Sequence, residues 1–158
     1  VNLGETSRGV EVARALLTAE PTLTVLGSAR LPVPRERAWE LLTTPEHIEQ
    51  WWSHPAVFPT GMHAGAHGTF EWVGHGLMPI HVTRFDPDER LHFYWGELGD
   101  PTPGDDASLI EFTLAPDGDN TVVLLVENMA PPQTRETLDG QVGGWTIVLK
   151  ALQDYAAR

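Results

Sequence analysis

The sequence contains no cysteine, and this absence excludes several kinds of chemistry. Without thiols the chain can form no disulfide bond, no thiolate nucleophile and no thiolate-bound metal site. It also has no uninterrupted run of about 18 apolar residues, so no transmembrane helix is expected. A secretory signal has a basic segment followed by a long apolar stretch, and the sequence does not open with one. The cytoplasm is therefore the expected location.

Basic residues are scarce as well. The 158 residues include 10 Lys and Arg against 22 Asp and Glu, which gives a formal net charge of −12. Because nucleic acids and anionic membranes attract positively charged surfaces, neither is expected as a partner. The hydrophobic content of 41% is that of a globular protein and not of a disordered chain. The length fits one domain over residues 1–158.

The start of the chain is predicted to be an extension, residues 1–21, that contains a short helix. Within residues 9–18, Val12, Leu16 and Leu17 fall on one helical face. The proline that follows would end this helix.

The rest of the chain gives both strand and helix signals. Alternating apolar residues predict a strand over 22–31, and proline-led segments after it predict two short helices. Hydrophobic spacing near 3.6 residues predicts a long helix over 133–157. Five further strands are predicted at 69–74, 77–85, 91–97, 107–115 and 120–129.

This order predicts an α+β fold. Short turns between consecutive strands favour antiparallel pairing in a sheet of about six strands. One face of such a sheet must be buried, and the last helix is the only predicted element long enough to cover it. We therefore expect a curved antiparallel sheet wrapped on a long C-terminal helix, with two short helices after the first strand. A cavity should remain between the sheet and the long helix.

Four segments carry a resemblance to a known family. They are "LPVPRERAWELLTTPEHIEQWW" (31–52), "FDPDERLHFYW" (85–95), "LIEFTLAPDGDNTVVLLVEN" (109–128) and "GGWTIVLKAL" (143–152). In this order they resemble the helix-grip fold of the START-like (SRPBCC) superfamily. More narrowly, they resemble the branch named after the activator of heat-shock protein 90 ATPase. The resemblance makes residues 22–157 the helix-grip core of a single START-like domain.

The resemblance implies three kinds of function and does not decide among them. Domains of this type hold hydrophobic ligands between the sheet and the last helix, some relatives are cyclases or hydrolases, and the eponymous members are co-chaperones. We expect a hydrophobic or aromatic small molecule as the partner, with no cofactor. A fold alone does not decide among these functions.

Glu127 is the most informative polar residue. If Val123 and Leu125 face the long helix, Glu127 and Met129 face it too, because side chains alternate along a strand. A buried carboxylate has to be hydrogen-bonded, paired or protonated. Two interpretations stay open at this point. Glu127 is a ligand anchor or an acid/base in the cavity, or it contacts water at the open rim of the sheet.

The aromatic residues predict the wall of the cavity. Most of them are explained by core packing, and the remainder would form a pocket of indole rings with a few polar groups. The predicted ligand-binding residues are Trp51, Trp52, Trp72, Phe93, Trp95, Phe112, Glu127, Met129, Trp145 and Leu149.

Two alternatives belong to other classes of function. In the first the protein is a cyclase- or hydrolase-type enzyme, in which Glu127 and either His81 or His92 form an acid/base pair. In the second it is a co-chaperone-like interaction module. Metal chemistry is not expected: His63 and His67 have the spacing of a chelating pair on a helix, but the glycines around them make a helix improbable.

The outer face of the predicted sheet and two glycines in the long helix need an explanation. Val122, Leu124 and Val126 should lie on the outer face of the sheet, which is unusually apolar for a solvated surface. The N-terminal helix or a second subunit, as in a homodimer, would cover it. Gly143 and Gly144 weaken the long helix by about 1 kcal/mol each relative to alanine. They would let the helix lie close to the sheet or leave volume beside Trp145.

Overall fold

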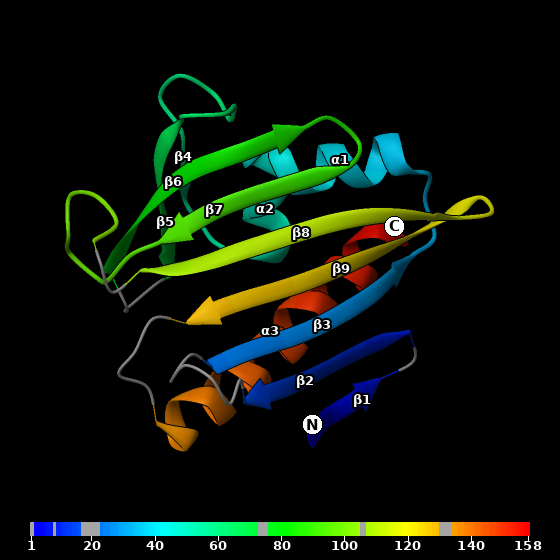
Figure 1. The fold of residues 1–158 in the computed structure, drawn as a ribbon. Coiled ribbons are helices and arrows are strands. Elements are labelled where there is room, and N and C mark those ends of the chain that lie inside the picture. Colours follow the sequence, from blue (N-terminus) through cyan, green and yellow to red (C-terminus); the bar gives the residue numbers. More distant parts are fainter. Residues whose placement is uncertain (1, 8, 17–22, 73–75, 105–106, 130–133) are drawn as a thin grey trace.

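The computed structural model describes residues 2–7, 9–16, 23–72, 76–104, 107–129 and 134–158. These residues form a nine-stranded antiparallel sheet in the order β1-β2-β3-β9-β8-β7-β6-β5-β4 (Figure 1). The strands are β1 (Asn2–Ser7), β2 (Val10–Leu16), β3 (Leu23–Leu31), β4 (Ala56–Val57), β5 (His67–Trp72), β6 (Gly76–Asp86), β7 (Arg90–Trp95), β8 (Ser108–Asp117) and β9 (Asn120–Met129).

The described residues also form three helices, α1 (Arg35–Thr43), α2 (Pro45–Trp51) and α3 (Arg135–Ala156). The long helix α3 packs against β1, β2 and β3, whereas α1 and α2 contact β8, β9 and β4 (Figure 1). Helix α3 begins at the N-cap Thr134, whose hydroxyl accepts a hydrogen bond from the Thr137 amide at 3.1 Å. The predicted α+β helix-grip architecture is confirmed.

Local turn chemistry fixes the register of the central strands. Asp86 pairs with Arg90 at the end of the β6–β7 hairpin, and Asp117 pairs with Asn120 at the end of the β8–β9 hairpin. Both turns contain a residue with positive φ, Asp88 at 65° and Gly118 at 61°. Asp, Asn and Gly tolerate this conformation, which explains why the sequence signals of these hairpins were reliable.

The predicted N-terminal helix over 9–18 is wrong. Residues 10–16 form strand β2, which pairs in antiparallel register with β3, and residues 17–18 lie outside the described part of the chain. Val10 and Val12 are completely or almost completely buried, and Glu11 between them is exposed. This alternation has a strand period, and the open edge of β3 supplies backbone partners that override the helical propensity of the Ala- and Leu-rich sequence.

One row of inward-facing side chains crosses five strands. Val25 pairs with Glu127, Glu127 with Ile110, Ile110 with Phe93, and Phe93 with Val82. All five are at most 1% exposed. Glu127 is therefore the carboxylate in an otherwise apolar row, and the open-rim interpretation of this residue does not hold.

The described N-terminal residues form no helix over the outer face of the sheet, because β1 and β2 extend the sheet at its edge. Val122 and Val126 are half-buried, and Leu124 is 43% exposed. Val126 pairs with Leu26 of β3, which is itself 39% exposed. Cover by a second subunit stays a prediction.

Helix α3 does not approach the sheet closely at its glycines. Gly143 and Gly144 are exposed, and a Cβ atom added at either position would meet nothing within 4 Å outside the helix itself. The expected close packing at these glycines is therefore wrong. The close approach of α3 to the sheet occurs at Gly27 of β3, where an added Cβ would lie 3.1 Å from Leu149 Cδ1.

Candidate functional site

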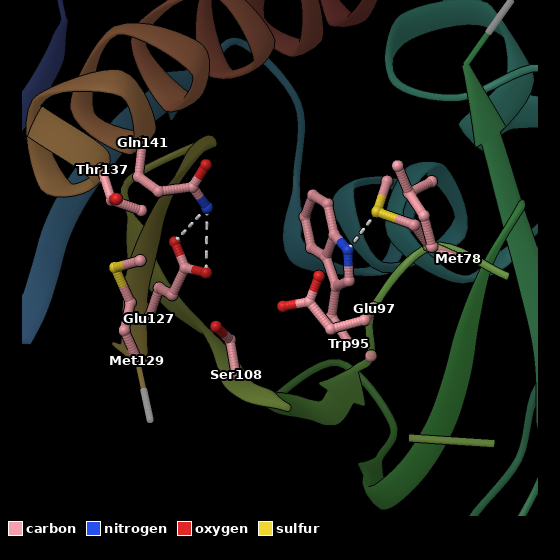
Figure 2. Close-up of a pocket in the computed structure, with 10 residues that line it drawn as sticks. Met78, Trp95, Glu97, Ser108, Glu127, Met129, Thr137 and Gln141 are labelled. Carbon is pink, nitrogen blue, oxygen red and sulfur yellow. Dashed lines mark hydrogen bonds between the residues drawn. The ribbon is translucent and has the colours of Figure 1, made fainter. Parts of the chain in front are cut away.

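A pocket of about 240 Å³ lies between the sheet and the first half of α3 (Figure 2). Glu127 and Met129 come from β9, Ser108 from β8, and Thr137 and Gln141 from α3. The opposite wall comes from β6, β7 and the segment after β7. It is lined by Met78, Trp95, Gly96, Glu97 and Leu98.

Glu127 lies in the wall of this pocket and is only 1% exposed. Its carboxylate accepts hydrogen bonds from Gln141 Nε2, at 2.9 Å to Oε1 and 3.1 Å to Oε2 (Figure 2). The Trp145 Nε1–H group donates a further hydrogen bond to Oε1 at 2.9 Å. These donors are neutral, so the carboxylate is hydrogen-bonded but its charge is not balanced by them.

Burial shifts the protonation of this group. Removal of water raises the pKa of Glu127, because the charged form loses its hydration. Hydrogen bonds from Trp145, Gln141 and Ser108 stabilise the charged form and oppose the rise. The net effect is a pKa above the ordinary glutamate value.

Helical periodicity brings the partners of Glu127 together. Thr137, Gln141 and Trp145 are spaced four residues apart on α3, so their side chains follow one another along one side of the helix. The first two line the pocket, and the last two bind Glu127. Gln141 was not among the predicted site residues, although its position four residues before Trp145 is a signal that could have found it.

Next to the pocket, aromatic rings fill the space between the sheet and the helices. The ring centroid of Trp52 lies 4.8 Å from that of Phe70, 5.2 Å from that of Trp145 and 5.6 Å from that of Trp95. Phe93 and Trp51 also pack against Trp52. We call the Trp52-centred group of Trp51, Trp52, Phe70, Phe93, Trp95, Phe112 and Trp145 the ring cluster.

The predicted ligand-binding residues lie in several different environments in the structure. Trp95, Glu127 and Met129 line the pocket, and Trp145 joins the ring cluster to Glu127. Leu149 is completely buried beside Gly27. Trp51, Trp52, Phe93 and Phe112 belong to the ring cluster. Trp72 ends β5, and its side chain lies outside the described part of the structure.

His81 and His92 are not brought to Glu127. His81 follows the buried Ile80 and precedes the buried Val82, so it faces the outer side of the sheet. There its ring stacks on that of His67, with centroids 4.2 Å apart.

His92 lies on the same outer face, 3.7 Å from a carboxylate oxygen of Glu111, and burial lowers the pKa of its imidazole. The acid/base pairs of Glu127 with His81 or His92 would need groups from opposite faces of the sheet. The predicted pairing is therefore not formed.

Other features of the described residues bear on metals and membranes. No three His, Asp or Glu side chains among them are grouped so as to hold a metal ion. No helix in the described ranges is long and apolar enough to cross a membrane.

The family of the chain follows from comparison with known proteins. Residues 32–157 match the family described as activator of Hsp90 ATPase homolog 1-like protein. The chain belongs to this family. None of the curated proteins is significantly similar to it in sequence.

Solved structures share the fold. Protein MLL2253 from Mesorhizobium loti is 25% identical, with a TM-score of 0.74 over 85% of this chain and 97% of that one. The Aha1 dimer from Colwellia psychrerythraea is 20% identical, with a TM-score of 0.68 over 83% and 93% of the two chains. DynU16, a protein in the dynemicin biosynthetic locus, is 23% identical, with a TM-score of 0.71 over 87% of this chain and 48% of that one.

Proposed function

We propose that this protein binds a small molecule with an apolar body in the pocket beside Glu127. The observation that carries the proposal is a carboxylate only 1% exposed in the wall of a pocket of about 240 Å³. A buried charged group costs free energy, so a protein that only needed a packed core would have an apolar residue at this position.

The pocket has the composition of a small-molecule site. Met78, Trp95, Leu98 and Met129 supply apolar surface, and a few polar groups are available to orient a ligand. Burial of ligand surface against these side chains would stabilise the complex by about 25 cal/mol per Å² of apolar area. The fold is shared with DynU16, from a biosynthetic locus, which is compatible with a small-molecule ligand.

The size of the pocket favours a compact ligand. Its volume of about 240 Å³ is less than the roughly 300–1,000 Å³ of typical drug-sized sites. The ring cluster packs beside the pocket, so a single-ring or similarly small molecule fits better than a fused polycyclic one.

Native mass spectrometry of the freshly purified protein tests the proposal, together with a fragment screen that follows tryptophan fluorescence. We expect retained or added small molecules to bind the wild type and to lose affinity in Ser108→Leu, which fills the pocket. The matched control is Thr113→Leu on the same strand β8, because Thr113 and the inward-facing Phe112 and Leu114 point to opposite sides. Equal binding by both variants would contradict the proposed site.

A further inference from the structure

The pocket has two carboxyl groups in its described wall and no basic side chain beside them. Its ten lining residues include Glu97 and Glu127 but no Lys, Arg or His. Among the described side chains, the salt bridges connect other residues, and the groups that donate hydrogen bonds to Glu127, those of Gln141, Trp145 and Ser108, are neutral. An ionised Glu127 therefore keeps its full charge toward the pocket.

The two carboxylates come from opposite walls. Figure 2 shows Glu127 beside Gln141 on one side and Glu97 beside Trp95 on the other, with the Glu97 carboxylate directed into the space between them. An anionic ligand would meet like charge from both sides, from Glu127, which is buried and weakly screened by water, and from the exposed Glu97. A positively charged group would gain attraction from both.

The remaining wall suits a cation with an apolar body. Trp95 borders the pocket, and indole rings attract cations through the negative charge of their faces. Met78 and Met129 add polarisable thioethers, which adapt to apolar groups of irregular shape. Leu98, which is 52% exposed, places apolar surface at the edge of the pocket.

We propose that the ligand of this pocket is a protonated amine on a small apolar or aromatic body, with its ammonium group on the Glu127 carboxylate. This inference rests on the proposed function and adds the chemical class of the ligand. The body of the ligand lies against Trp95 and the two methionines. Glu97 contributes attraction from the opposite wall.

Three probes of similar shape test the inference by calorimetry near neutral pH. They are 2-phenylethylamine, 2-phenylethanol and 3-phenylpropionate, which differ in the charge of one terminal group. We expect the amine to bind about tenfold tighter than the alcohol, which corresponds to roughly one charged hydrogen bond. The carboxylate should show no measurable binding.

Two variants test whether Glu127 causes the preference for the amine. Glu127→Gln keeps the shape of the side chain and should remove the preference for the amine, while the alcohol still binds and shows that the pocket is intact. Glu111→Gln is the matched control, because Glu111 lies on the neighbouring strand β8 and pairs with the outward-facing Val126. It changes the net charge equally and should keep the preference.

The outcomes separate this inference from the proposal on which it depends. Equal affinity for the amine and the carboxylate, or an unchanged amine preference in Glu127→Gln, would overturn the amine assignment and leave a binding pocket. Failure of all three probes and of the fragment screen would overturn the pocket function and the amine assignment together.

Discussion

Around Trp52 the space between the sheet and the helices is filled by aromatic rings, whereas around Glu127 a pocket of about 240 Å³ remains open. Trp145 belongs to both regions, since its ring packs in the ring cluster and its Nε1–H group binds Glu127. The difference shows that one sheet–helix interface can combine close packing with a polar recess. The ring cluster should determine stability, and the pocket should determine ligand binding.

The largest effect is expected from a substitution in the ring cluster. Phe93→Ala removes a ring that is 1% exposed, and we expect the free energy of unfolding to fall by about 3–5 kcal/mol through lost burial and a cavity. Denaturant titration measures the change. Tyr94→Ala is the control on the next residue, since Tyr94 is 39% exposed on the outer face and should cost clearly less. Equal costs would mean that the ring cluster is not the stabilising region.

A smaller effect is expected where the two regions meet. Trp145→Phe keeps an aromatic ring but removes the donor to Glu127, and we expect a loss of about 1–3 kcal/mol from the less satisfied carboxylate. In the double variant with Glu127→Gln the losses should be less than additive, because the two side chains share one interaction. Strict additivity in thermal or denaturant unfolding would show that the hydrogen bond contributes nothing.

The pH dependence of stability reports on Glu127 directly. Because the folded state raises its pKa, the native protein binds more protons than the unfolded chain between the ordinary and the raised pKa. Stability should therefore fall as pH rises through this window, by up to about 1.4 kcal/mol per pH unit from this group.

Other groups titrate too, so the measurement compares the wild type with Glu127→Gln from about pH 5 to about pH 8. Relative to the variant, the wild type should gain stability as the pH is lowered. A difference that stays constant, or that changes in the opposite direction, would contradict a raised pKa.

The smallest effect is expected on the exposed side of α3. Gly144→Ala should stabilise the protein by about 0.5–1 kcal/mol, because alanine is the better helix former and its methyl group meets open space. Gly68→Ala is the contrasting variant, since an added Cβ would overlap the ring of Phe58 and should destabilise the sheet. Destabilisation by Gly144→Ala would show that this side of α3 has a packing partner.

Short-range signals in the sequence were sufficient for most of the fold. The hairpins around Asp88 and Gly118 and the 3.6-residue spacing of α3 depend on local chemistry, which one chain segment contains by itself. Residues 10–16 were predicted incorrectly, because their conformation depends on hydrogen bonds to β3 and not on their own propensity. The single domain was predicted from the length of the chain and its core, residues 22–157, from the resemblance, and both stay predictions.

The candidate site was predictable in part. The alternation of side chains along a strand was enough to predict that Glu127 faces α3, since this alternation follows from backbone geometry. It could not predict that Gln141 and Trp145 would bind the carboxylate, or that His81 and His92 would lie on the opposite face. Those relations depend on how separate elements pack against one another.

The sequence by itself therefore determined the order of the core elements and the inward direction of one carboxylate, because both follow from periodicity along the chain. Only the tertiary structure decided how much of the sheet–helix space the indole rings fill and where a pocket is left. The physical reason is that packing volume depends on the relative placement of β7, β9, α2 and α3. Contacts between segments distant in the sequence determine that placement.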